Sequence, residues 1–399
     1  MKRMISCLLA AVALLPLLLF TGCIQGVQTS ELALVEAVGI DRTDDGRLKL
    51  TLQIFAPRGS GSATAVDSSK NNSVILTATG DTISQAVEQA NQMQGKTMFL
   101  GHNRVIVLGQ SLVAESIQPI LSFFDRSENT RQNARVLVSA VTAEEIVSTG
   151  VQQGILSAES LEAMIRQGEE SDGALECNYF SLSMQLDDTG GSALIPVIRP
   201  LPEEETQSQS QDSSSSGEEG VSMAQLNHFQ LEGTALLQNY ALTTVFSQEV
   251  TKGLCFLLNE SDYPVLVLSY EDTTLSARLH QSSSSWSVSG EGAVLSVQAK
   301  ASIDELLQPG ERESENDFTQ MEQLAGEEIA SLCQSAYREV TAYQANVLDL
   351  MDQLKWSDGD AWEAMKEKPE EFLAGLSLQV EVEVTFDRTG LETNQKVGR

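Results

Sequence analysis

Apolar and polar residues alternate strictly over 48–54, which predicts a half-buried β-strand. The apolar run 32–40 precedes this strand, and Thr43-Asp44-Asp45-Gly46 between the two segments has the residue types of a tight turn. Two strand patterns joined by a short turn are typical of a β-hairpin. We therefore expect the chain to begin its folded part with a hairpin.

Short apolar strands and helical patterns follow one another through the rest of the first half. Strands are predicted at 74–76, 105–108 and 136–138, and helices after Thr82, over 117–124 and after Thr142. Thr82 with Gln85, and Thr142 with Glu145, have the spacing of N-terminal capping boxes. This half predicts strands with helices packed on them.

The second half begins with strand-like runs and ends with a helix and a strand. The runs are 234–237, 253–258, 265–268 and 294–299, and the polar stretch Gln281–Ser285 is predicted to interrupt them. Apolar residues recur at helical spacing from Asn316 to Lys355, with Gly326 as a candidate bend. Residues 378–386 alternate most clearly and predict an amphipathic strand.

These patterns together predict an α+β protein of several domains. We expect mixed or antiparallel sheets with packed helices, and one long helix before a C-terminal amphipathic strand. The length of 399 residues agrees with two or three domains, at roughly 100–200 residues each.

The stretch 202–220 divides the chain. It holds five Glu and one Asp, with no basic and no large apolar residue. Such a composition cannot bury enough apolar surface to offset the entropy of ordering, so a disordered linker is predicted. The expected regions are an N-terminal domain at 23–201 and a C-terminal region at 221–395, with a candidate division into subdomains near 281–292.

The first 22 residues have the pattern of a secretory signal peptide. Lys2 and Arg3 precede an apolar stretch at 5–20, which is shorter than the about 20 residues that a bilayer core requires. Phe20-Thr21-Gly22-Cys23 resembles a bacterial lipobox, with Phe where Leu is usual. We expect cleavage before Cys23, a diacylglycerol on its thiol, and a chain held on the outer face of the membrane. An uncleaved N-terminal anchor is the alternative.

Charge narrows the possible partners. The chain has 25 basic and 56 acidic residues, for a net charge of −31. Phosphate groups repel such a chain, so nucleic acid is excluded as a general partner. Purely electrostatic binding to anionic lipid is excluded for the same reason.

Motifs of catalysis and metal binding are absent from the sequence. G-x-S-x-G, a Walker loop, H-E-x-x-H and C-x-x-C do not occur. We therefore expect a protein that binds rather than catalyses, with no catalytic, metal or cofactor-binding residue and no cofactor.

Four residues are the remaining candidates for chemistry. His102 follows Gly101 and precedes a predicted strand, and we interpret it as a structural histidine bonded to a turn carbonyl. Cys177, Cys255 and Cys333 are spaced 78 residues apart, which is not a ligand spacing. We interpret them as buried small hydrophobes, with one disulfide and one free thiol as the alternative.

Several short segments, in order along the mature chain, carry a family likeness. They are Gly22-Cys23, Val38–Asp41, Leu50–Ile54, Gly95–His102 with Arg126 and Arg131, Gly233–Ala235, Lys252–Leu254, Tyr343–Leu348, Trp362, Glu371-Phe372 and Val382–Gly390. This set resembles the Ger(x)C lipoproteins, the C subunits of bacterial spore germinant receptors. The chain departs from the family pattern at Ile24-Gln25, at Asn346 and at Pro369.

The resemblance implies a non-enzymatic subunit of a nutrient receptor. It implies a place on the outer surface of the spore inner membrane, beside two integral-membrane subunits, and a role in the response to nutrient germinants. It also implies an α+β fold of three domains, with a boundary near Ser282–Ser285. A solute-binding lipoprotein of a transporter is the alternative from another class, and a lipoprotein hydrolase is the third.

Overall fold

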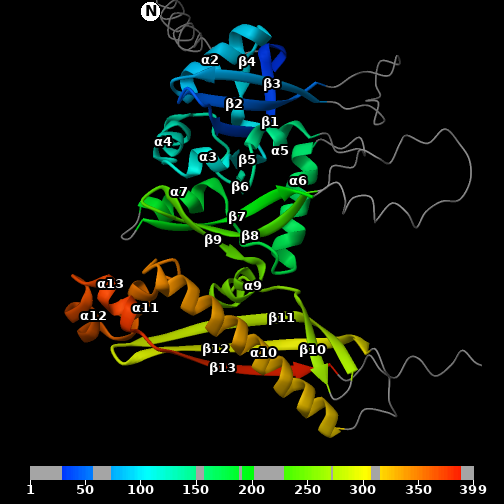
Figure 1. Ribbon diagram of the computed structural model, residues 1–399, viewed down its shortest axis with the longest axis vertical. Coiled ribbons are helices and arrows are strands. Elements are labelled where there is room, and N and C mark those ends of the chain that lie inside the picture. Colours follow the sequence, from blue (N-terminus) through cyan, green and yellow to red (C-terminus); the bar gives the residue numbers. More distant parts are fainter. Residues whose placement is uncertain are drawn as a thin grey trace, which may run out of the picture.

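The computed structural model describes residues 29–56, 73–149, 157–187, 191–201, 229–270, 273–306 and 315–387. The predicted signal peptide, Cys23 and the predicted linker at 202–220 lie outside these residues. Figure 1 shows a larger sheet at one end of the long axis, a smaller sheet at the other, and a helix between them. The predicted α+β fold with mixed sheets is confirmed.

The larger sheet has nine strands in the order β3-β2-β1-β5-β6-β7-β8-β9, with β4 pairing with β1. The strands are β1 (Leu32–Arg42), β2 (Leu48–Phe55), β3 (Ser73–Gly80), β4 (Thr97–Phe99), β5 (Val105–Leu108), β6 (Arg135–Ser139), β7 (Ser192–Pro200), β8 (Phe229–Gln238) and β9 (Ala241–Ser247). The predicted hairpin is confirmed as β1 and β2, with Ile40 opposite Leu50. The central strands β1, β5, β6 and β7 run parallel, and the outer pairs are antiparallel.

Helices cover both faces of this sheet. One face packs against α2 (Ile83–Gln94), α3 (Gln110–Val113), α4 (Gln118–Arg126) and α7 (Tyr179–Asp187), and the other against α5 (Ala143–Ser148) and α6 (Ser157–Glu170). Two short 3-10 helices, η1 (Thr29–Glu31) and η2 (Leu100–His102), complete this part. Both predicted caps are formed: Thr82 accepts the N–H of Gln85, and Thr142 accepts that of Glu145, each at 3.2 Å.

Strands β8 and β9 lie beyond the predicted linker in sequence, yet they complete the larger sheet. β8 pairs antiparallel with β7, from Ser192 opposite Gln238 to Pro200 opposite Phe229. The two strands on either side of the predicted linker are therefore neighbours in one sheet.

The predicted strand-like run at 253–258 is wrong, because it lies in the helix α9 (Gln248–Leu257). The hydroxyl of Ser247 caps this helix by accepting the N–H of Val250. A short run that is apolar on every side fits a buried helix as well as a buried strand, so periodicity alone does not separate them. A Cβ at Gly253 would lie 2.3 Å from the carbonyl oxygen of Leu332, which shows how closely the next long helix approaches.

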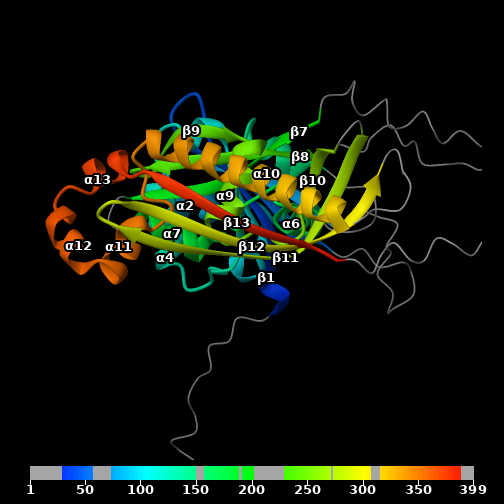
Figure 2. The ribbon, with the colours of Figure 1, turned by 90° about the horizontal axis from the view of Figure 1, so that it is seen from below.

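The smaller sheet has the order β10-β11-β12-β13, formed by β10 (Val265–Tyr270), β11 (Thr273–Ser289), β12 (Gly292–Leu306) and β13 (Leu378–Phe386). The long helix α10 (Glu315–Ala342) runs along one face of it (Figure 2) and contacts both α9 and β13. The predicted C-terminal strand is confirmed as β13, which pairs parallel with β12.

The prediction that the polar stretch Gln281–Ser285 interrupts the strand-like runs is wrong. This stretch lies within β11, where Ser283 pairs with Gln298 and Ser285 with Ser296 of β12. Gln281, Ser283 and Ser285 are exposed on the face of the sheet that α10 does not cover. One open face needs no apolar side chains, so serine is compatible with a strand here.

The predicted helix from Asn316 to Lys355 is also corrected. α10 passes through Gly326 without a break and ends at Ala342, and α11 (Leu350–Ser357), α12 (Gly359–Met365) and α13 (Pro369–Gly375) follow as separate short helices. Gln344 and Asp349 have the left-handed φ values of 55° and 51°, which end a right-handed helix.

Candidate functional site

A cavity of about 690 Å³ lies where the larger sheet meets the short C-terminal helices. One wall comes from the larger sheet and its helix α7: Leu186, Gly191 and the β8–β9 turn at Gln238, Asn239 and Tyr240. The other wall comes from the α10–α11 connection and from α11, α12 and α13, which lie next to the end of α10 in Figure 1. We call this space the junction cavity.

The β8–β9 turn is the part of the first wall that hydrogen bonds hold in place. Asn239 and Tyr240 both have left-handed φ values, 51° and 67°, as in a two-residue hairpin turn that matches the twist of its strands. The hydroxyl of Tyr240 donates to Asp187 at 2.6 Å, and its carbonyl accepts the N–H of Ile117 at 2.8 Å. The turn is therefore held by two neighbouring helices.

Tyr343 connects the two walls. Its carbonyl accepts a hydrogen bond from Gln238 at 3.1 Å, and its hydroxyl donates to Thr244 at 3.3 Å. Its ring lies edge-on to Phe246, with 5.9 Å between ring centroids. The left-handed Gln344 that follows then turns the chain toward α11.

The second wall carries the charges of the cavity. Lys355 of α11 and Lys366, the residue after α12, hold their ammonium groups 5.3 and 5.1 Å from the ring centroid of Trp362. Lys366 also forms an ion pair with Glu363 at 2.7 Å, and this hydrogen bond raises the pKa of Lys366. Asp352 is the acidic residue of the lining.

A second group of ionisable residues joins the loop after α6 to the loop after α9. Asp172 accepts the hydroxyl of Ser261 at 2.6 Å, and Glu260 accepts the backbone N–H of Glu176 at 3.0 Å. Glu169 forms an ion pair with Arg135 at 3.0 Å. Desolvation by burial raises the pKa of Asp172 to about 7 and that of Glu169 to about 7. We call Glu169, Asp172 and Glu260 the acidic clamp.

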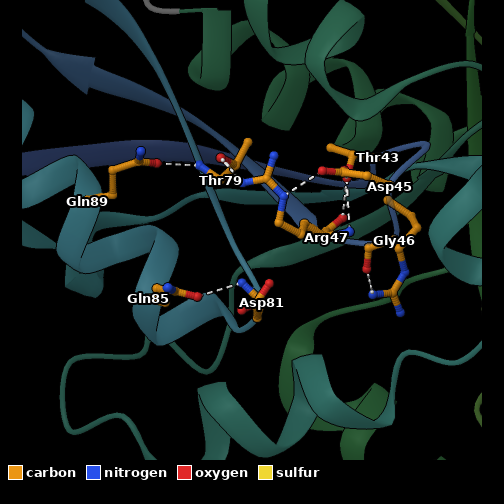
Figure 3. A network of polar contacts seen from close by, with 9 residues as sticks. Thr43, Asp45, Gly46, Arg47, Thr79, Asp81, Gln85 and Gln89 are labelled. Atoms are coloured by element: carbon orange, nitrogen blue, oxygen red, sulfur yellow. Dashed lines mark hydrogen bonds and ion pairs between the residues drawn. The ribbon is translucent and has the colours of Figure 1, made fainter.

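A polar network at the β1–β2 turn is structural. Figure 3 shows Arg47 between Asp45 of the turn and Thr79 of β3: its Nε donates to Asp45 at 2.7 Å and its Nη1 to Thr79 at 3.3 Å. The N–H of Thr79 in turn donates to Gln89 of α2 at 2.7 Å. The network fixes the hairpin and α2 relative to each other.

The residues singled out in the sequence do not meet in one site. His102 is exposed in η2, with its ring 5.9 Å from that of Phe99, and the predicted bond to a turn carbonyl is not formed among the described residues. Cys177, Cys255 and Cys333 are buried and free. Burial raises the pKa of all three thiols, that of Cys333 to about 12. Their interpretation as buried small hydrophobes is confirmed.

Sequence reasoning missed both the junction cavity and the acidic clamp. Their residues come from segments far apart in the chain, and 56 acidic residues give no reason to select three of them. Within the described ranges, no group of three His, Cys, Asp or Glu side chains is arranged to hold a metal ion. No helix there combines the length and apolar character needed to cross a bilayer.

The motif residues of the resemblance have structural roles in this fold. A Cβ at Gly39 would lie 3.1 Å from the carbonyl oxygen of Ala143, so this glycine lets α5 pack on β1. Arg104, after the Gly101-His102 motif, bonds Glu36 at 3.0 Å and Glu162 at 2.6 Å. Thr234 lies 2.9 Å from the hydroxyl of Thr251, which joins β8 to α9.

Comparison with known proteins finds a family model for each half of the chain. The family model for the spore germination protein N-terminal domain matches residues 26–200, and that for the spore germination B3/GerAC-like C-terminal domain matches 232–390. Spore germination protein KC of Bacillus subtilis (strain 168) is 20% identical over 98% of this chain and 97% of its own. Spore germination protein A3 of the same organism is 31% identical over 32% of this chain and 34% of its own.

A solved structure shares the fold. The crystal structure of the GerBC protein superposes with a TM-score of 0.54 at 14% sequence identity, covering 88% of this chain and 96% of that chain. The two domain models match the chain in sequence order and together cover more than half of it. Spore germination protein KC is matched along nearly its whole length. The chain therefore belongs to the Ger(x)C family of spore germination proteins.

Proposed function

We propose that this chain is the lipid-anchored, non-catalytic subunit of a spore nutrient germinant receptor. The observation that carries the proposal is the ordered match of both germination-protein domains on one chain that begins with a signal peptide pattern and Cys23. In this role the chain works on the outer face of the spore membrane, beside two integral-membrane receptor subunits.

Exposed apolar side chains support the proposal that the chain functions while bound to partner proteins. Phe180 and Met184, one turn apart on α7, are 54% and 59% exposed, and Trp356 of α11 is 84% exposed. Neighbouring large apolar side chains on a helix face favour a contact surface over a freely hydrated one. We expect these side chains to become covered when the receptor assembles.

Deletion of the gene tests the proposed role. Spores without the gene should lose the response to at least one nutrient, yet still germinate with a trigger that acts downstream of nutrient receptors. A wild-type copy should restore the response, and the integral-membrane subunits should co-purify with the restored protein. An unchanged nutrient response, in a strain with no second receptor, would contradict the proposal and favour the solute-binding alternative.

A further inference from the structure

We propose that the junction cavity binds a small organic monocarboxylate with an apolar or aromatic body. This inference does not depend on the proposed role in germination, because it concerns a ligand site within this chain alone. It rests on the size of the cavity, the chemistry of its walls and the placement of its two lysines.

The dimensions of the cavity suit a small molecule. Its volume of about 690 Å³ falls in the range of known ligand sites, roughly 300–1,000 Å³. Leu186, Met351 and Leu373 supply apolar wall, and Tyr343 and Trp362 supply aromatic faces. Such walls take up the carbon body of a ligand, and the few polar groups among them fix its orientation.

The charge of the lining is opposite to that of the whole chain. The chain carries 25 basic and 56 acidic residues, whereas the cavity is lined by Lys355, Lys366 and the single acid Asp352. Two lysines against one acid in the lining, within so acidic a protein, make this wall a candidate site for an anion.

Both ammonium groups lie beside the same aromatic ring. They are within 5.3 Å of the Trp362 ring centroid, so the positive charges of the cavity lining flank this ring. Lys366 shares its charge with Glu363, but Lys355 forms no ion pair within the part of the chain that the structure describes. Lys355 is thus the main anchor for a carboxylate, and the Trp362 ring beside it receives the body of the ligand.

The same wall disfavours other classes of ligand. An amine would meet two ammonium groups, so cations are rejected. A dianion such as phosphate would meet the carboxylates of Asp352 and Glu363 and the field of a chain with net charge −31. A carboxylate carries one charge and two acceptor oxygens, which suits the ammonium group of Lys355.

Equilibrium dialysis of the full chain in detergent micelles tests the inference, with phenylacetate as the probe. Phenylacetamide, 2-phenylethylamine and inorganic phosphate are the comparison compounds. We expect saturable binding of phenylacetate, and binding of phenylacetamide about tenfold weaker or more, as for loss of a charge-assisted hydrogen bond. Equal binding of the acid and the amide, or no saturable binding of the acid, would overturn the inference.

Two variants locate the site. The double variant Lys355→Met with Lys366→Met should weaken phenylacetate binding about tenfold or more, whereas Lys300→Met should leave it unchanged. Lys300 is the matched control, because it is also exposed but lies on β12, away from the cavity lining. Circular dichroism confirms that both variants are folded. Equal loss in both, or loss in neither, would place the binding elsewhere and overturn the inference.

Discussion

The carboxylate of Asp41, at the end of β1, accepts the backbone N–H of Ala143, the first residue of α5, at 2.7 Å. Its second oxygen accepts the N–H of Glu144 at 2.9 Å. A strand residue therefore caps a helix that begins 102 residues later. Burial raises the pKa of Asp41, although both backbone hydrogen bonds oppose this effect. Within the Val38–Asp41 motif, Gly39 therefore gives α5 room to pack on β1, and Asp41 caps the start of α5.

Replacing Asp41 should measure the strength of this cap. We expect Asp41→Ala to lower the free energy of unfolding by about 2 kcal/mol, because two backbone N–H groups at the start of α5 lose their acceptor. Urea unfolding followed by circular dichroism gives the value. Asp44→Ala, in the exposed β1–β2 turn, is the matched control and should change it by less than about 0.5 kcal/mol.

The contact between α9 and α10 predicts a position where even a methyl group is not tolerated. A Cβ at Gly253 would lie 2.3 Å from the carbonyl oxygen of Leu332 and 2.6 Å from the Cβ of Ala336. Gly253→Ala should therefore cost about 2 kcal/mol or more, since backbone has to move. Gly359→Ala places its methyl group in open space and should be tolerated. Similar thermal midpoints for both variants would contradict this packing.

The acidic clamp predicts how stability depends on pH. Burial raises the pKa of Asp172 and of Glu169 to about 7, whereas an unfolded chain has carboxyl pKa values of about 4. Folding therefore takes up protons between these values, and stability falls as the pH rises from about 5 to about 7. The groups facing Asp172 are Ser261, Asp262 and Lys252. Those facing Glu169 are Arg135, Glu170, Glu176 and Glu260.

Unfolding midpoints in urea at pH 5, 6, 7 and 8 check this sign. The wild-type midpoint should decrease between pH 5 and pH 7, and Asp172→Asn should flatten the decrease because the amide does not titrate. Asp44→Asn, in the exposed β1–β2 turn and away from the clamp, serves as the control. A midpoint that rises over this window in the wild type would mean that the clamp is ionised at little cost.

The three buried cysteines should be inert in the folded chain. Burial raises the pKa of Cys177, Cys255 and Cys333, so the reactive thiolate is scarce and the reagent is excluded. An aromatic disulfide reagent should label none of them in the native protein and all three in denaturant. Prompt labelling of any one under native conditions would show that its region opens readily.

Cys23 remains the predicted anchor, and fatty-acid labelling tests it. Radioactive fatty acid fed to growing cells should label the wild-type protein and not Cys23→Ala, because the apolar stretch 5–20 is short for a membrane span. Cys177→Ala controls for loss of a cysteine as such. Label that persists in Cys23→Ala would refute the lipoprotein interpretation.

Elements with one buried face were predictable from sequence, and elements set by tertiary contact were not. The alternation over 378–386 became β13, because one face of that strand packs on α10. The helical spacing of apolar residues predicts α10 correctly up to Val340, but the predicted helix extends too far. Gln344 and Asp349 adopt left-handed backbone, which the spacing of apolar residues does not detect. The apolar run at 253–258 is buried on all sides, so it carried no period to distinguish helix from strand.

The junction cavity was beyond sequence reasoning for a geometric reason. Trp362 was noted only as a motif residue, and nothing in the order of residues places it opposite the turn at Asn239 and Tyr240. Residues more than a hundred positions apart converge there because α10 returns the chain to the larger sheet. Only the fold brings those side chains together.

The return of β8 to the edge of β7 has a consequence for cutting the chain. A protease that cleaves once between residues 201 and 229 would separate the two family domains in sequence but not in space, because the ladder from Ser192–Gln238 to Pro200–Phe229 still joins them. The nicked protein should migrate as one particle in its native state and as two fragments only after denaturation. Expressed separately, each half would expose an unpaired strand edge, and the two halves should reassociate when mixed.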